Sequence, residues 1–441
     1  MNTSKHDVTA ATINRAAARR LKLSHAQSAT HTPPNAPRKK APIARLARTG
    51  SGVTAEIGGA ITDYPEEQES TNFPAMTIKQ QRSRFLPQWR TVEHMRRVLL
   101  IALLAACGFP LSLTARPKAL FYLTQDPAGV RSFLAHSRKI DILVPTWYSV
   151  DASGLVWGGP DELVMKTARD RHVPVMPIIV NPGFNQNAFH KLVNRTSAQA
   201  HLIDSLLREC KMHGYSGIQF DFENVIWTDR EALTALVTYA ARSLHREGLQ
   251  LSIATVPNAP GYPGKRAYSH WIYENWRGAY DLKALAGQVD LVCLMTYDEH
   301  TRHTPPGPVA GYPWVLENLD YALQSVPKEK LSLGIPLYGQ RWFAPDPGTD
   351  NRASQPAASV GASDVQLLLD TFHPQVQWDP VDKTSWFYFY RDQMREWVFF
   401  TDVRTFRERW NLADERGLQG FCSWVLGRED EGIWQLLPEH P

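Results

Sequence analysis

The chain of 441 residues is 43% apolar, which is enough to bury a large core in one large domain or two ordinary ones. Its net charge of +4 is unevenly distributed, because residues 1–94 hold 14 Lys and Arg against 7 Asp and Glu. The remaining chain is therefore slightly acidic, which argues against a nucleic-acid-binding body. The four cysteines form no CxxC pair and show no metal-ligand spacing, so we expect neither a metal ion nor a cofactor.

Residues 1–94 are rich in Ala, Arg, Thr, Ser and Pro and lack a sustained apolar period, so they are predicted to be a disordered basic extension. A basic, acid-poor start is also compatible with an organelle transit peptide or with contact to an anionic surface. We prefer the interpretation that translation starts internally, because the next segment has the features of an N-terminus.

Residues 95–116 are predicted to be a signal peptide or a signal anchor. Met95-Arg96-Arg97 forms a charged beginning, and Val98 to Gly108 supplies the apolar run that follows it in secretory signals. The uncharged stretch 98–115 contains Gly108 and Pro110, so it is at the short limit for a membrane anchor. Leu104-Ala105-Ala106-Cys107 also resembles a lipoprotein cleavage box, with Cys107 as the lipidated residue. Each alternative predicts export to the periplasm, the cell envelope or the medium.

From Ala119 onward, strand-like runs alternate with amphipathic helical stretches such as 198–213 and 229–247. Eight such strands indicate an α/β fold, a (β/α)8 TIM barrel formed by residues 117–441. The predicted strands are 119–123, 140–148, 173–180, 217–223, 249–256, 289–297, 331–337 and 417–424.

A long segment separates the seventh strand from the eighth. It holds a Pro/Ser/Gly-rich loop at 344–361, a helix at 362–372 and alternating strands around 375–379, 385–391 and 395–400. Residues 340–400 are therefore predicted to form a small α+β insertion in the barrel.

The fourth strand, within His213 to Val225, has chemically different faces. At a period of two, one face is apolar and the other polar, formed by Ile218, Phe220 and Phe222 and by Gln219, Asp221 and Glu223. Asp221 and Glu223 lie roughly 7 Å apart along such a strand. Two carboxylates that close in a half-buried site repel each other, so one should keep its proton near neutral pH and serve as a general acid. A salt-bridged pair at a strand end is the alternative.

Ser216 to Glu223 resembles the D-G-x-D-x-D-x-E signature of family 18 glycoside hydrolases, the chitinase family, and in particular the bacterial branch that acts on cell-wall or spore peptidoglycan. Asp221 and Glu223 match the last two acidic positions. Ser216 and Gln219 depart from the signature, because Asp, or sometimes Asn at the second place, is usual there. Gln219 can hydrogen-bond Asp221 but cannot take up its charge or exchange a proton with it.

Further motifs extend the resemblance over residues 117–437. Met295-Thr296-Tyr297-Asp298 resembles the family's M-x-Y-D motif, and Leu333 to Gly339 is also in the family's style. Phe421 to Trp424 matches the family's Trp at the cleft floor, and the first strand carries Phe121-Tyr122. In the family, an insertion like that at 340–400 forms one wall of the cleft.

The resemblance implies a substrate-assisted retaining mechanism. Glu223 would be the general acid and then the base, while Asp221 would orient the substrate's 2-acetamido group. Tyr297 would hydrogen-bond the acetamido oxygen, Asp298 would contact the distorted sugar and Trp424 would stack under it. Tyr122, Gln219 and Met295 complete the predicted substrate-binding set.

The preferred function is an exported, monomeric glycosidase that cuts β-1,4 bonds in an N-acetylglucosamine-containing polysaccharide, peptidoglycan or chitin. A lectin-like protein on the same barrel is the alternative, although such relatives usually lose the catalytic Glu. A structural cell-envelope protein anchored through residues 95–115 is the third reading. Some of the 14 tryptophans, among them Trp147, Trp157, Trp314, Trp342 and Trp386, would line the cleft or pack in the core.

Overall fold

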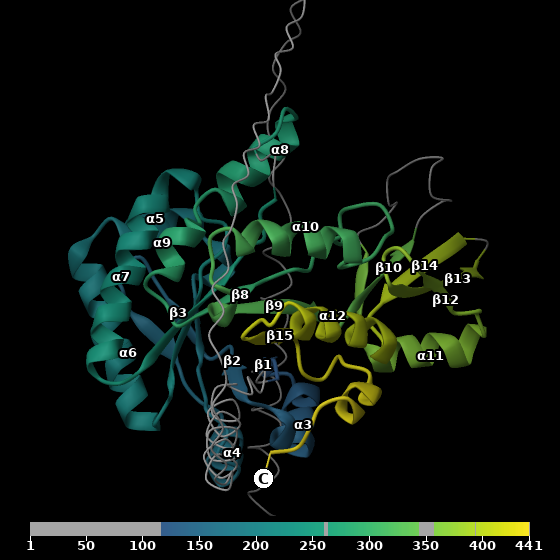
Figure 1. Cartoon of the computed structure of the whole chain (residues 1–441), viewed down its shortest axis with the longest axis horizontal. Coiled ribbons are helices and arrows are strands. Elements are labelled where there is room, and N and C mark those ends of the chain that lie inside the picture. The colour runs from purple at the N-terminus through teal and green to yellow at the C-terminus, as the bar shows by residue number, and fades with distance from the viewer. Residues whose placement is uncertain (1–115, 260–262, 344–356, 393, 441) are drawn as a thin grey trace, which may run out of the picture. The chain divides into compact units, whose positions relative to one another are not determined.

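The computed structural model describes residues 116–440 except 260–262, 344–356 and 393 (Figure 1). The predicted extension at 1–94, the signal segment up to residue 115 and most of the loop predicted at 344–361 lie outside the described residues. Within the described part of the chain, no helix is long and apolar enough to cross a membrane.

Parallel strands form a closed barrel, which confirms the predicted fold. In hydrogen-bonded order they are β2 (Ile142–Pro145), β1 (Lys118–Leu123), β15 (Gly420–Trp424), β9 (Leu331–Pro336), β8 (Leu291–Leu294), β7 (Gln250–Thr255), β6 (Gly217–Asp221) and β5 (Ile178–Val180). The ring closes because Leu143 of β2 exchanges two 2.9 Å backbone hydrogen bonds with Pro174 and Met176, just before β5. The second predicted strand is split, since β3 (Tyr148–Val150) continues β2, pairs with β5 and forms a hairpin with β4 (Val156–Gly158).

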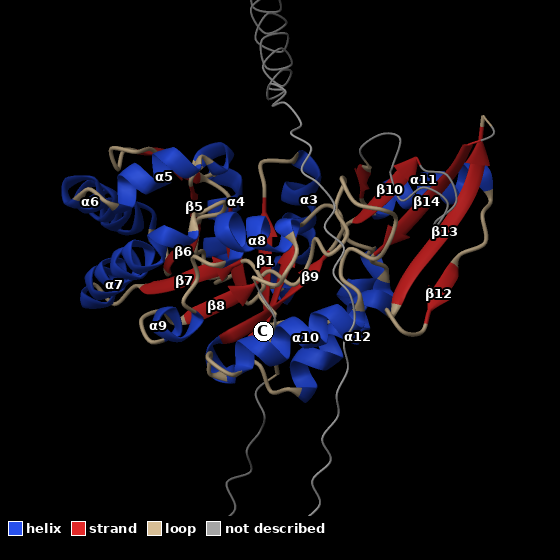
Figure 2. Cartoon of the chain, turned by 90° about the horizontal axis from the view of Figure 1, so that it is seen from above, coloured by secondary structure: helices blue, strands red, loops and turns tan. Residues whose placement is uncertain are grey.

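Helices surround the barrel (Figures 1 and 2). They are α3 (Pro127–His136), α4 (Glu162–Asp170), α5 (Gln186–Val193), α6 (Thr196–His213), α7 (Arg230–Arg246), α8 (Ala267–Ile272), α9 (Leu282–Ala286), α10 (Tyr312–Leu323) and α12 (Val403–Glu415). Short turns of helix lie between them, namely η1 (Ser137–Lys139), η2 (Pro182–Phe184), η3 (Trp227–Asp229), η4 (Tyr273–Arg277), η5 (Lys328–Lys330) and η6 (Glu431–Gln435). Local sequence sets several helix ends: the Asp161 carboxylate caps α4, and Gly214, with a φ of 71°, ends α6 in the left-handed region that favours glycine.

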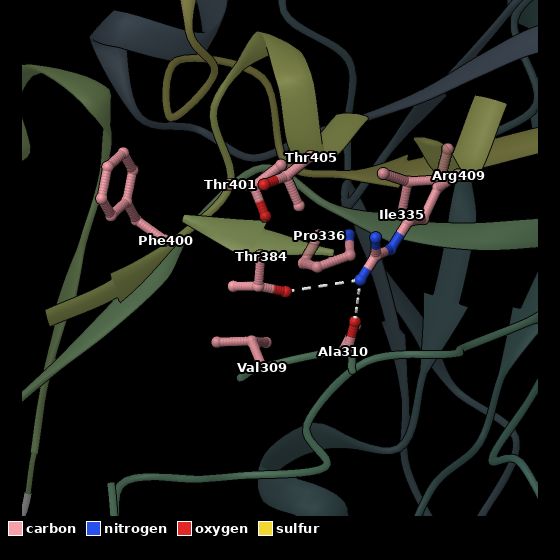
Figure 3. A pocket seen from close by; sticks show the side chains of 9 residues that line it. All are labelled: Val309, Ala310, Ile335, Pro336, Thr384, Phe400, Thr401, Thr405 and Arg409. Carbon is pink, nitrogen blue, oxygen red and sulfur yellow. Dashed lines mark hydrogen bonds between the residues drawn. The ribbon is translucent and has the colours of Figure 1, made fainter. Parts of the chain in front are cut away.

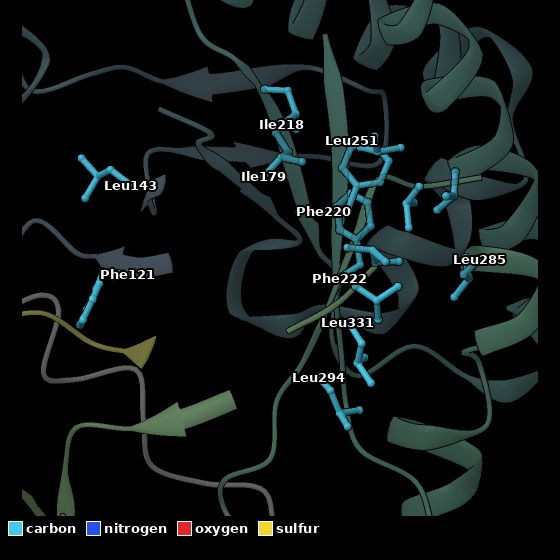
Figure 4. Close-up of a cluster of buried hydrophobic side chains, with 14 of the residues drawn as sticks. Phe121, Leu143, Ile179, Ile218, Phe220, Phe222, Leu251, Leu285, Leu294 and Leu331 are labelled. Atoms are coloured by element: carbon cyan, nitrogen blue, oxygen red, sulfur yellow. The ribbon is translucent and has the colours of Figure 1, made fainter. Parts of the chain in front are cut away.

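The two faces of β6 pack into separate clusters, as the period of two predicts. Ile218, Phe220 and Phe222 are at most 1% exposed and pack outward among strands and surrounding helices (Figure 4). Burial of each such phenylalanine contributes roughly 1.5–3 kcal/mol. The inward cluster is formed by residues such as Leu120, Tyr122, Ile178, Cys293 and Met295. The polar face of β6 therefore looks into the barrel.

The insertion between β9 and β15 is confirmed as a small α+β unit. Its antiparallel sheet has the order β11 (Ala358–Val360), β10 (Gly339–Phe343), β14 (Met394–Phe400), β13 (Thr384–Arg391) and β12 (Gln377–Asp379), with α11 (Ala362–Phe372) packed on one face (Figure 2). Strands β10 and β11 were not predicted, because each is short and they flank the loop that dominates the local composition.

Arg409 on α12 joins the insertion to the barrel. Its buried guanidinium donates to the backbone carbonyls of Lys383 and Asp382 at 2.8 Å and also contacts Ala310 and Thr384 (Figure 3). Burial lowers the pKa of Arg409 to about 10, so the side chain remains cationic at neutral pH. The adjoining cavity measures only about 10 Å³, which is far too small for a sugar ring. This junction is therefore structural, and the candidate site lies elsewhere.

Candidate active site

Asp221 and Glu223 lie at the carboxyl end of β6, where a barrel of this kind concentrates its chemistry. Asp221 ends the strand, is 8% exposed and points inward, while Glu223 is half-buried just beyond it. Burial raises the pKa of Asp221 to about 7. Burial also raises the pKa of Glu223 well above its ordinary value, and the charges of Asp221 and Asp298 raise it further. A carboxyl that keeps its proton near neutral pH can act as a general acid.

Gln219 forms the floor beneath Asp221 and is fully buried. Its amide nitrogen donates to Ser252 Oγ at 2.8 Å and to Cys293 Sγ at 3.1 Å. Both N–H donors are thus used, and none is left for Asp221. Although a Gln side chain can hydrogen-bond Asp221, in this structure the donors of Gln219 are taken by acceptors on β7 and β8. Gln219 Oε1 and Asp221 Oδ1 are both buried without a protein partner.

Tyr297 and Asp298 follow β8 and form another part of the mouth. Asp298 has a φ of 64°, in the left-handed region, and its carboxylate accepts a hydrogen bond from the hydroxyl of Tyr338, just after β9. Although Asp298 retains exposed surface, desolvation by the surrounding protein raises its pKa, and the Tyr338 hydrogen bond opposes that rise. The ring of Tyr297 meets that of Tyr338 edge-on, with centroids 6.5 Å apart.

Tyr122 and Trp424 bring the ends of β1 and β15 together. Their ring centroids lie 5.4 Å apart at an interplanar angle of 55°, and a cis peptide bond joins Trp424 to Val425. Met295 belongs to the same inward cluster, against which Tyr297 and Trp424 also pack. Burial raises the pKa of Tyr297 well above its ordinary value, so its hydroxyl stays protonated and can donate to a ligand. The predicted site residues thus converge from four strands of the barrel, β1, β6, β8 and β15.

Three residues near the site were not predicted to belong to it. Tyr338 was part of a recognised motif without an assigned role. Asn181 follows β5 directly and makes two hydrogen bonds to the backbone of Glu223. Tyr280 donates to the Phe222 carbonyl at 2.6 Å. A polar residue at the end of a buried strand was the available signal for Asn181, whereas Tyr280 reaches the site from a connecting segment that shows no such pattern.

The five tryptophans considered for the cleft divide between the core and the surface. Trp147 and Trp314 pack in or against the outer core, and Trp342 and Trp386 pack with the insertion sheet. Trp157 is exposed on β4. As for metals, the described residues contain no group of three or more His, Cys, Asp or Glu that could hold an ion.

A parallel (β/α)8 barrel with buried carboxyl groups of raised pKa, tyrosines and a tryptophan at the carboxyl ends of its strands is typical of the class of barrel glycoside hydrolases. Within that class, the chain belongs to glycosyl hydrolases family 18, whose model matches residues 131–429. The family resemblance stated from the sequence is thereby confirmed.

Characterised relatives fall into two groups. The chain is 27% identical over 296 residues to the cortical fragment-lytic enzyme of Bacillus subtilis, covering 66% of this chain and 66% of that enzyme's length, and 25% identical to mouse chitotriosidase-1, covering 56% of each. Among solved structures, it is similar to a chitinase from Chromobacterium violaceum, with 25% identity, a TM-score of 0.65 and coverage of 72% and 97% of the two chains. It also resembles in fold the spore cortex-lytic enzyme SleL of Bacillus megaterium, with 24% identity, a TM-score of 0.64 and coverage of 74% and 75%.

Proposed function

We propose that this protein is a retaining glycosidase that cuts β-1,4 bonds next to N-acetylglucosamine in peptidoglycan or chitin. The observation that carries the proposal is the placement of Asp221 and the half-buried Glu223 together at the carboxyl end of β6, where burial raises the pKa of both. Burial and neighbouring negative charge favour the protonated form of Glu223, and a proton is what a glycosidic leaving group requires.

The proposed chemistry assigns one step to each acid. Glu223 protonates the glycosidic oxygen while the carbonyl oxygen of the substrate's 2-acetamido group attacks the anomeric carbon. Asp221 orients that acetamido group and balances the charge that develops on it. Water then opens the cyclic intermediate with Glu223 as the base. Because the same carbon is inverted twice, the product keeps the configuration of the substrate.

The aromatic and hydroxyl groups would hold the reacting sugar. Tyr297 keeps its hydroxyl proton and would donate a hydrogen bond to the acetamido oxygen. Trp424, packed beside Tyr122, would offer a ring face to the sugar. Asp298, held by Tyr338, would contact a hydroxyl of the distorted ring. Met295 lies in the same cluster and would fill apolar space beneath the acetamido methyl group.

The substrate class rests on the relatives. Similarity to the cortex-lytic enzymes supports peptidoglycan as the substrate, and similarity to the chitinase supports chitin. Both polymers are therefore included in the test. The proposed location is outside the cytoplasm, in the periplasm, the envelope or the medium. That location is supported by the charged start and apolar run at 95–107, with a membrane anchor at 98–115 or lipidation of Cys107 as variants of it. We further propose that the protein acts as a monomer.

A carbohydrate-binding protein without catalysis is the second candidate, and the unusual Gln219 beneath Asp221 is the observation in its favour. Incubation of the purified chain with peptidoglycan and with chitin oligomers, followed by mass spectrometry and by NMR of the new anomeric centre, separates the two candidates. We expect cleavage of at least one polymer with the β-configured product formed first. Binding of either polymer without any product would support the non-catalytic carbohydrate-binding protein. An α-configured first product would contradict the substrate-assisted step.

A further inference from the structure

Glu223 lies just beyond the last residue of β6 that takes part in the barrel's hydrogen-bonded ladder. The pairing of β6 with β5 ends where Val180 is in register with Asp221. The backbone of Phe222 and Glu223 therefore needs other partners, because peptide groups in a buried setting rarely remain unpaired. The position of the Glu223 carboxyl depends on what those partners are.

Asn181 provides two of them. The residue follows Val180 directly, is 2% exposed, and its side-chain nitrogen donates to the Glu223 carbonyl at 2.8 Å. Its side-chain oxygen accepts from the Glu223 N–H at 3.1 Å. A residue of a parallel strand would receive this same pair of hydrogen bonds from a neighbouring backbone. Among side chains of this length, only that of Asn carries a donor and an acceptor in one rigid plane.

Tyr280 secures the preceding peptide group. Its hydroxyl donates to the Phe222 carbonyl at 2.6 Å, and the side chain is buried. Burial, together with the charges of Glu223 and Asp221, raises the pKa of Tyr280 well above its ordinary value, so this hydroxyl remains a donor. On the other side, Asn224 has a φ of 52° and donates to the Phe184 carbonyl at 2.9 Å. Side chains thus fix the chain on both sides of Glu223.

From this geometry we infer that Asn181 is a positioning residue for Glu223, with Tyr280 as its helper, an inference that rests on the proposed function. Asn181 does not touch the substrate. It extends the β5–β6 ladder by one side chain, so that Glu223 leaves the strand in a fixed direction. A general acid must meet the glycosidic oxygen within hydrogen-bond reach, and a displacement of about 1 Å can cost on the order of 100-fold in rate.

The test uses Asn181→Leu, which keeps the branched shape of the side chain, although Leu is larger, and removes both hydrogen bonds. We expect kcat on the cleaved glycan to fall about 10–100-fold while KM stays within about threefold, because the sugar-holding residues are untouched. Tyr280→Phe removes one hydroxyl only and should lower kcat about 3–10-fold; it carries the same test if Asn181→Leu does not fold.

Asn318→Ala is the matched control. Asn318 is also a fully buried asparagine that donates to a backbone carbonyl, that of Trp314 at 2.8 Å, but it lies on α10 away from the mouth. The control should lose stability and keep its kcat within about twofold. A kcat within twofold of wild type for both Asn181→Leu and Tyr280→Phe would overturn the inference.

A crystal structure of Asn181→Leu, or of Tyr280→Phe if the first variant does not fold, separates failure of this inference from failure of the proposed function. If the wild-type chain cleaves no glycan, the proposed glycosidase function is wrong. The crystal structure of the variant still decides whether Asn181 positions Glu223. A Glu223 carboxyl displaced by about 1 Å or more supports positioning, and an undisplaced carboxyl refutes it.

Discussion

The side-chain nitrogen of Gln219 on β6 lies 2.8 Å from the hydroxyl oxygen of Ser252 on the neighbouring β7. This contact, together with the one to Cys293, makes the floor beneath Asp221 neutral. Burial alone accordingly raises the pKa of Asp221, to about 7, with no second carboxylate contributing from below. The substitution in the family signature therefore removes charge from the barrel interior rather than leaving a gap in its packing.

Gln219→Asp should restore a carboxyl pair and change the pH dependence of turnover. A second buried acid beside Asp221 makes it harder to ionise both, so one of them should titrate at higher pH. The pH–rate profile should gain or shift a limb upward, with turnover equal or better near its optimum. The profile of kcat/KM against pH for both proteins measures this.

Gln219→Asn is the matched control, because it has the length of Asp without the charge and should leave the limbs in place. If the enzyme is active and Gln219→Asp leaves the pH dependence of kcat/KM unchanged, position 219 does not influence Asp221. Undetectable turnover in both wild type and variant, with sugar affinity changed only modestly, would indicate a binding protein instead.

Glu223→Gln should abolish turnover and leave oligosaccharide binding nearly intact. The amide keeps the shape of the side chain but has no acidic proton to give. A loss of at least about 1000-fold in kcat is expected, compared with a change in affinity of less than about fivefold, measured by product formation and by calorimetry on the same glycan. Turnover close to that of wild type would remove Glu223 from the role of the acid.

The barrel and the acidic strand were predictable because both depend on local patterns. The sequence shows a period of two in this strand, with Ile218, Phe220 and Phe222 alternating with polar residues. The predicted strands also recur between amphipathic helices. Partners in space were less accessible. The amide nitrogen of Gln219 donates hydrogen bonds to Ser252 and Cys293, which lie 33 and 74 positions away in sequence. Nothing local could rank those acceptors above Asp221, two residues along the same strand.

Export should depend on the apolar run that follows Arg97. Replacing Leu100 and Leu103 by Arg should keep the protein in the cytoplasm, because charges in such a run oppose insertion into the membrane. Cell fractionation measures the outcome, and wild-type distribution of the double variant would contradict the proposed location. Cys107→Ser is the companion experiment: loss of lipid labelling would identify a lipoprotein, and an unchanged product a cleaved or anchored form.

The raised pKa of Asp221 also makes the stability of the fold depend on pH. An unfolded aspartate titrates near about 3.9, whereas burial raises the folded pKa to about 7. Between these values the native state holds a proton that the unfolded state has lost, so the free energy of unfolding decreases as pH rises.

Asp221→Asn removes this titration. Its stability relative to wild type should therefore increase from pH 4.5 to pH 8, by about 3 kcal/mol at ~1.4 kcal/mol per pKa unit. Urea denaturation at several pH values measures the difference. Asp204→Asn on α6 is the control for the loss of one carboxyl group at an exposed position. If the stability difference between Asp221→Asn and wild type does not change with pH, Asp221 is ionised in the folded protein over this range. The proton shared by the pair would then reside on Glu223.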